Sequence, residues 1–251
     1  MVTQAELIEF FNQLLQPEKF TDYCPNGLQV AGKNQINRLI SGVTACQALL
    51  DKAVEYQADA ILVHHGYFWK GEAQVIVGMK QRRIKQLLSH DINLFAYHLP
   101  LDAHIEVGNN VQFAKQLNLF VEKYPSQPQQ DFLFAGRTQV PMDIDSFSAH
   151  LARILHRVPL HIKASKPSVH RLAWCTGAAQ DDIERAAQLG VDAFISGEIS
   201  ERTVHIAREL DIHYFACGHH ATERYGVQQL AAKVAQQFGI EHRFVDIDNP
   251  V

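Results

Sequence analysis

Two stretches of this sequence resemble each other at one constant spacing. We call this spacing the repeat offset; it relates position 38 to position 171. Seven of 26 positions are identical between the segment that begins at Arg38 and the segment that begins at Arg171. The identical pairs are Arg38 and Arg171, Leu39 and Leu172, Ala45 and Ala178, Gln47 and Gln180, Ala53 and Ala186, Asp59 and Asp192, and Ala60 and Ala193. Each segment runs from an apolar strand through an amphipathic helix to a second apolar strand, which is the pattern of a parallel βαβ unit. We therefore expect two similar α/β lobes, an internal repeat.

The first lobe shows this alternation most clearly. Residues 38–44, 60–63 and 92–98 have the pattern of buried strands, and helical patterns lie between them. Such an order predicts mixed, mainly parallel sheets. A composition break follows, because residues 122–143 contain EKYPSQPQQ, with two prolines and three glutamines. We place the lobe boundary there and predict lobes at 1–125 and 126–251.

Charge and composition exclude several classes of protein. The formal net charge is −4, which argues against broad binding to nucleic acid or anionic lipid. No apolar run approaches the roughly 18 residues that span a bilayer, and the N-terminal segment lacks the basic start of a secretory signal. The four cysteines are dispersed, so a disulfide framework or a cysteine zinc site is not expected. We expect a cytoplasmic protein with no membrane contact.

Histidines gather where the predicted strands end. The chain has 14 histidines, with adjacent pairs at His64-His65 and His219-His220. His98 and Asp102 follow one strand with the same spacing as His219 and Glu223 after another. Ligands bind beyond the carboxyl ends of parallel strands. If the two lobes face each other, one site collects these groups: His64, His65, His98, Asp102, His219, His220 and Glu223.

Imidazole and carboxylate donors together suit Zn, Fe, Mn or Ni. The set is larger than one catalytic zinc needs, which favours a dinuclear site with two divalent ions bridged by a carboxylate. Neighbours in a strand point to opposite faces, so we expect His64 and His65 to lie where the strand gives way to a turn. His219 and Glu223 share a face if a helix begins there.

Several motifs together resemble one known family. They are DYCPNGLQV (22–30), GVTACQALL (42–50), HHGYFWKG (64–71), HLPLDAHxxxGNN (98–110), SGEIS (196–200) and GHHATERYG (218–226). The resemblance is to the NIF-three-like family, also catalogued as GTP cyclohydrolase 1 type 2 homologues. It implies two divalent metal ions per subunit, between two α/β lobes. It also implies a homohexameric ring. The family's ligands match His64, His65, Asp102, His219 and Glu223.

Other residues near the expected site allow two interpretations each. Tyr67–Lys70 could stack on a base and contact a phosphate, or could pack at a lobe or subunit contact. Glu198 is the repeat counterpart of His65 and is our candidate catalytic residue, as a general acid or base. It could equally orient a ligand or cap a helix. His98 and His220 could lie behind the ligands or at an open position.

The leading functional hypothesis is a metal-dependent hydrolase, cyclohydrolase-like or phosphoesterase-like, which acts on a nucleotide or a phosphoester-like substrate. The alternative is a protein that binds or delivers metal, or acts as a scaffold, without turnover. Both need the same ligands, so the sequence does not separate them. Standard nucleotide motifs such as G-x-x-x-x-G-K-[ST] are absent from the sequence.

Overall fold

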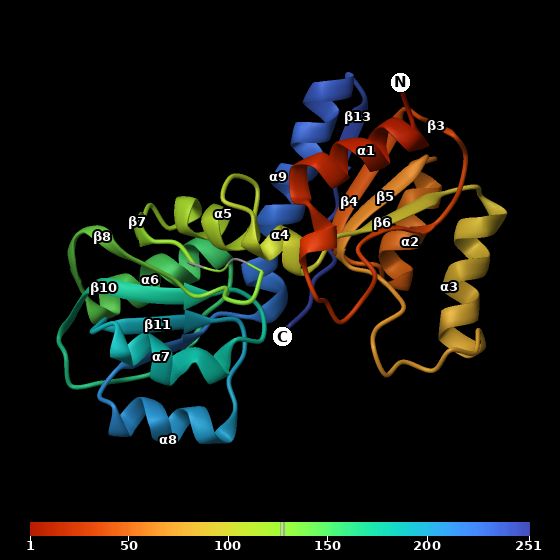
Figure 1. The fold of residues 1–251 in the computed structure, drawn as a ribbon. Helices are drawn as coiled ribbons and strands as arrows, with labels where there is room; N and C mark the ends of the chain where they lie inside the picture. The colour runs from red at the N-terminus through yellow and green to blue at the C-terminus, as the bar shows by residue number, and fades with distance from the viewer. Residues whose placement is uncertain (126, 128) are drawn as a thin grey trace. The chain divides into compact units, whose positions relative to one another are not determined.

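The computed structural model has a mixed α/β fold with mixed sheets (Figure 1). It describes residues 1–125, 127 and 129–251. Ser126, at which the second predicted lobe begins, and Pro128 lie outside the described residues. None of the described helices is long and apolar enough to cross a membrane.

The chain divides into two compact units. The first consists of Met1–Gly108 and Gly226–Asp248, and the second of Asn109–Tyr225 and Asn249–Val251. The units and the predicted lobes have different bounds, because the segment after residue 225 returns to the first unit.

A five-stranded sheet in the order β13-β4-β5-β6-β2 forms the centre of the first unit (Figure 1). Its ladders are parallel except the one between β2 and β6. The strands of this unit are β1 (Val2–Thr3), β2 (Gly27–Val30), β3 (Gln35–Ile36), β4 (Arg38–Thr44), β5 (Ala60–His65), β6 (Asn93–Ala96) and β13 (Glu241–Phe244). Its helices are α1 (Gln4–Leu15), η1 (Pro17–Lys19), α2 (Gln47–Glu55), α3 (Gly78–Ser89) and α4 (Leu99–Ala103), with the later part of α9 (His219–Phe238).

Strand β5 shows why this sheet is covered on both faces. Successive side chains of a strand point to opposite faces. Ala60 and Leu62 pack into a core cluster with α1 and α9, whereas Ile61 and Val63 pack into one with α2 and α3. Burial of each of the larger side chains contributes roughly 1.5–3 kcal/mol to the stability of the fold. The run of buried apolar residues therefore fixes the position of β5 in the sheet, and with it the point at which the strand ends.

A six-stranded sheet in the order β7-β8-β10-β11-β12-β9 forms the centre of the second unit. The strands are β7 (Phe120–Lys123), β8 (Phe134–Asp143), β9 (Leu160–Ile162), β10 (Ser168–Cys175), β11 (Ala193–Ser196) and β12 (His213–Ala216). The helices are α5 (Asn109–Gln116), α6 (Ile144–Leu155), η2 (Gln180–Asp182), α7 (Ile183–Gln188) and α8 (Glu201–Glu209), with the first turns of α9. Apolar clusters lie on both faces of this sheet as well.

Parallel ladders do not predominate in the second unit, so the prediction of mainly parallel sheets is wrong there. Only β10-β11 and β11-β12 are parallel, whereas the other described ladders are antiparallel. The added strands β7, β8 and β9 come from 120–162. The spacing of apolar residues predicts a strand at 158–163, where β9 lies, but the composition break hid β7 and β8. An antiparallel edge strand needs no crossover helix and so leaves no βαβ pattern in the sequence.

The parallel strands of the two units begin with matching contacts. In the first unit the carboxylate of Asp59 accepts hydrogen bonds from the backbone amides of residues 37–38, at 2.7 and 3.0 Å. In the second unit the carboxylate of Asp192 accepts them from residues 170–171, at 3.0 and 2.9 Å. All of these positions are related by the repeat offset.

Candidate metal centre

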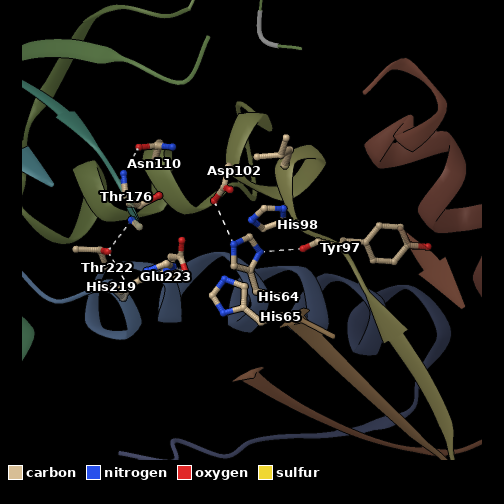
Figure 2. A network of polar contacts seen from close by, with 12 residues as sticks. His64, His65, Tyr97, His98, Asp102, Asn110, Thr176, His219, Thr222 and Glu223 are labelled. Carbon is tan, nitrogen blue, oxygen red and sulfur yellow. Dashed lines mark hydrogen bonds and ion pairs between the residues drawn. The ribbon is translucent and has the colours of Figure 1, made fainter. Parts of the chain in front are cut away.

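His64 and His65 are the last two residues of β5, so they lie where this strand ends. The ring of His64 is fully buried. Its Nδ1 donates a hydrogen bond to the carbonyl oxygen of Tyr97 at 2.9 Å, and its Nε2 lies 3.5 Å from Oδ1 of Asp102 (Figure 2). The ring centroids of His64 and His65 are 4.6 Å apart. The two rings are therefore close together, although neighbouring side chains in a strand point to opposite faces.

His65 is half-buried, and its Nδ1 forms a hydrogen bond with the hydroxyl of Thr44 at 3.2 Å. Thr44 pairs with His65 across the β4-β5 ladder, which explains the contact. The ring of Trp69 lies 5.8 Å away. The parallel ladder thus provides a side-chain partner that sets the orientation of His65.

Asp102 lies in the short helix α4 and is 7% exposed. His98 is the N-cap of α4 but makes no side-chain cap hydrogen bond. The cap comes instead from Asp22, whose Oδ2 accepts the amide hydrogen of Leu99 at 3.0 Å. A distant carboxylate therefore fixes the start of the helix that carries Asp102.

Asp22 also binds the ring of His98, at 2.7 Å from Nδ1. Burial acts to raise the pKa of Asp22, but hydrogen bonds from His98, Asn26 and the amide of Tyr23, with the charge of the imidazole, lower that pKa below its usual value. Asp22 is therefore a carboxylate at neutral pH. Asn26 accepts the amide hydrogen of His98 at 2.7 Å, so the motif at 22–26 fixes both the backbone and the ring of His98.

The structure brings three imidazoles together in the first unit. One ring nitrogen of each of His64, His65 and His98 lies within 4.8 Å of the other two, and Figure 2 shows the rings gathered near Asp102. Trp69 packs edge-on against His98, with ring centroids 5.1 Å apart. Tyr67 is 6% exposed and belongs to the core, so the aromatic segment contributes to packing and also reaches the imidazoles.

In the second unit, His219 begins α9, as its helical spacing from Glu223 requires. Its Nε2 lies 3.1 Å from Glu223 (Figure 2). Its Nδ1 lies 2.7 Å from Glu198. Burial acts to lower the pKa of His219, but hydrogen bonds and charge from Glu223 and then Glu198 raise it to about 9. Glu198, our candidate catalytic residue, is thus in contact with a predicted metal ligand.

Two glycines make room for these side chains. A Cβ at Gly177, whose φ is +72°, would lie 2.3 Å from Oε1 of Glu223. A Cβ at Gly197 would lie 2.7 Å from Cα of His219. Thr222 accepts the amide hydrogen of Gly177 at 3.1 Å, which joins α9 to the loop after β10. Both loops therefore need glycine for the close approach of α9.

The donors suit a divalent cation in both units. Asp102 and Glu223 are 7% and 2% exposed, and the side chain of Asp22 is 3% exposed. Burial of a carboxylate is costly unless a positive charge and hydrogen bonds compensate for it. Within each unit the ion pairs of these carboxylates run to histidines, whose neutral form is a metal ligand. Mixed nitrogen and oxygen donors fit Zn, Fe, Mn and Ni.

Sequence reasoning missed the residues that orient the predicted ligands. These residues are Asp22, Asn26, Thr44, Gly177, Gly197 and Thr222. The one available signal was the motif DYCPNG, whose Asp22 and Asn26 flank turn residues. His220 is 8% exposed, and its backbone amide donates a hydrogen bond to Val251.

Comparison with known proteins agrees with this architecture. The chain is 53% identical over 251 residues to the GTP cyclohydrolase 1 type 2 homolog of Pseudomonas aeruginosa, with 99% of each chain covered. It is 49% identical to the protein of that name from Vibrio cholerae, with 100% of both covered. The solved structure of the protein ybgI, of unknown function, superposes with a TM-score of 0.95 at 45% identity over 100% of both chains. The family model Duf34/NIF3 (NGG1p interacting factor 3) matches residues 2–250, and the chain belongs to this family.

Proposed function

We propose that this protein binds two divalent ions through His64, His65 and Asp102 of the first unit and His219 and Glu223 of the second. The buried carboxylates beside imidazoles in both units support the proposal. The chain passes between the units after Gly108 and after Tyr225, six residues beyond Asp102 and two beyond Glu223. Ligands so close to two of the three points at which the chain passes between the units suit one shared, dinuclear site.

The function that this donor set supports best is hydrolysis of a nucleotide or a phosphoester-like substrate. A divalent ion bound by these residues would polarise the attacked bond and lower the pKa of a bound water towards about 7. The relatives' name, GTP cyclohydrolase 1 type 2 homolog, favours a purine nucleotide as the first substrate to test. Trp69, beside His65 and His98, offers an aromatic ring edge near such a base.

Glu198 acts in this proposal as the residue that orients His219. Its hydrogen bond of 2.7 Å to Nδ1 directs Nε2 of the ring towards Glu223. A carboxylate behind a ligating histidine raises its basicity and fixes its tautomer. With a side chain 34% exposed, Glu198 is also accessible to a substrate proton, which keeps its role as a general base open to test.

The observation that carries the proposal is the buried pairing of carboxylates with imidazoles, and metal analysis tests it. Purified protein should contain or take up close to two divalent ions per chain, and His65→Ala should remove at least one. Metal-loaded protein should then hydrolyse GTP or a generic phosphoester, and Asp102→Asn should abolish turnover. Two tightly bound ions without turnover would favour the metal-delivery alternative. Unchanged metal content in His65→Ala would contradict the site.

The two units, in this proposal, descend from one repeated unit. The ladders support it, since Leu39 pairs with Ala60 in one sheet and Leu172 with Ala193 in the other, and the repeat offset relates the two pairs. The repeat would explain why the candidate ligands follow corresponding strands.

Self-association into a hexameric ring is part of the same proposal. The segment after Trp69 exposes a group of apolar side chains, which suits an interface between copies. They are Val75, Ile76 and Val77, with Met79 and Leu88 on α3. Light scattering that shows only a 28.3 kDa monomer at micromolar concentration would contradict this part.

The four free cysteines support a reducing, cytoplasmic location.

A further inference from the structure

We propose that His98 is an additional metal-binding side chain, which completes a three-imidazole set with His64 and His65 and is positioned by Asp22. The inference rests on the proposed metal centre and adds a ligand to it. Three features of the first unit carry it: the tautomers of the rings, the burial of Asp22, and the place of His98 in the chain.

The hydrogen-bond partners fix the tautomers of two rings. The carbonyl of Tyr97 and the carboxylate of Asp22 only accept hydrogen bonds, so Nδ1 of His64 and Nδ1 of His98 must each carry the hydrogen. In a neutral imidazole the lone pair is then on Nε2. The hydroxyl of Thr44 can take either role, and it contacts Nδ1 of His65 in the same way. All three rings thus use Nδ1 for a protein contact, and Nε2 is the nitrogen that suits a cation.

Asp22 has the properties of a residue behind a metal ligand. A ligating histidine nearly always donates its other ring hydrogen to a carboxylate, a carbonyl or a water. Asp22 is almost completely buried, and its other oxygen binds the amide of Leu99 at the start of α4. One side chain therefore couples the orientation of His98 to the position of the helix that carries Asp102. A purely structural histidine would need no such coupling.

The chain places His98 where a ligand is expected. It follows β6, the neighbour of β5 in a parallel ladder, so the ends of both strands lie at one edge of the sheet. No protein hydrogen bond to Nε2 of His98 is present among the described residues, and its remaining ring neighbours are aromatic or imidazole. The nitrogen that carries the lone pair belongs to a ring whose centroid lies 5.1 Å from that of His64 and 5.8 Å from that of His65.

The deciding variant is His98→Asn. The NH2 group of the asparagine can still donate a hydrogen bond to Asp22, but the side chain lacks the Nε2 lone pair that would bind a metal ion. The variant therefore keeps the hydrogen bond and removes the proposed ligand. Asp22→Asn tests the orientation of the ring from the other side, and His242→Asn is the matched control. His242 is a half-buried histidine of the same unit, and its Nε2 forms a hydrogen bond with the hydroxyl of Ser41 at 2.8 Å.

Zn²⁺ affinity is measured by competition with a chromophoric chelator, and the ligand field by the visible spectrum of the Co²⁺-loaded protein. We expect Asp22→Asn to weaken one ion about 10- to 100-fold. His98→Asn should weaken it at least as much and alter the Co²⁺ spectrum, whereas His242→Asn should match the wild type. Wild-type affinity and an unchanged spectrum in His98→Asn would overturn the inference. If His65→Ala then still loses metal, the proposed function survives; if the wild type itself binds no metal, both fail.

Discussion

The two units orient their candidate metal-binding side chains in different ways. In the first, three imidazoles each place Nδ1 against a different partner, a carbonyl, a hydroxyl or a carboxylate. In the second, His219 lies between two carboxylates, Glu198 and Glu223. Position 198 is related to His65 by the repeat offset, so a carboxylate stands where the other unit has an imidazole.

This contrast shows which parts of a repeated fold tolerate change. The contacts of Asp59 and Asp192 at the starts of the strands match almost bond for bond. The side chains at the ends of the strands differ in chemistry. Strand starts serve stability, whereas the carboxyl ends are where α/β sheets bind ligands. The first unit thus offers mainly neutral donors, and the second offers negative charge.

Removal of one carboxylate from either unit should have the strongest effect on metal binding. If Asp102 or Glu223 bridges the two ions, Asp102→Asn or Glu223→Gln should weaken both ions, because two cations then repel each other without a shared anion. We expect a loss greater than the roughly 100-fold typical of a residue behind the ligands. His64→Ala should weaken mainly one ion. Isothermal titration that shows both carboxylate variants losing a single ion would mean independent sites.

Glycine at position 177 provides the next largest effect. Gly177→Ala should cost about 1–3 kcal/mol of unfolding free energy from its positive φ, and should also displace Glu223 and weaken metal binding. Gly190→Ala is the matched control in the same unit. Gly190 has a φ of +66°, but no atom lies within 4 Å of its would-be Cβ. Denaturation should show similar strain in both variants, and metal affinity should fall only for Gly177→Ala. Equal metal affinity in the two variants would show that the loop at Gly177 does not set the position of Glu223.

The matched carboxylates test whether the two strand starts are equivalent in energy. Asp59→Asn and Asp192→Asn should each destabilise the protein by about 1–3 kcal/mol, because an amide cannot accept all the hydrogen bonds it inherits. The loss should be larger for Asp59, whose side chain is 11% exposed, than for Asp192, at 27%. Urea denaturation measures both. A larger loss at Asp192 would show that local burial does not set the difference.

The smallest expected effect is a dependence on pH of the strands around His161 in the second unit. Burial, and then the charges of His213 and Lys163, lower the pKa of His161 to about 4. Its unfolded value is near 6.5. The unfolded chain binds more protons between these values, so the stabilising contribution is present above pH 6.5 and is lost as the pH falls through 4.

Hydrogen exchange at pH 7 and pH 5 should therefore show β9 and β12 losing protection in acid. In the first unit Asn93, which binds the carbonyl of Lys33, stands where His213 binds the carbonyl of Lys166. An amide does not titrate, so β6 should lose less protection. His161→Gln should reduce the effect in the second unit. Equal loss in β6 would assign the acid response to other groups.

The sequence predicted those features that leave a local pattern. Strand 38–44 follows from an apolar run, and a helix that holds both His219 and Glu223 follows from their spacing; the structure has both elements. Strands β7 and β8 were missed because their segment begins with a composition break. The role of Asp22 was missed because its partner His98 is 76 residues away in sequence. No periodicity reports a contact across that distance.

Helix α9 has a consequence for the order in which the protein is made. Its residues Val227, Leu230, Ala231 and Val234 complete the core around α1, and β13 then adds the last strand beside β4. The second unit has all but its last three residues once the ribosome has passed Tyr225. The first unit, although its N-terminal part emerges earliest, waits for the segment after residue 225. During synthesis the later-encoded unit therefore has its parts first, and the earlier one exposes an unfinished apolar face to chaperones.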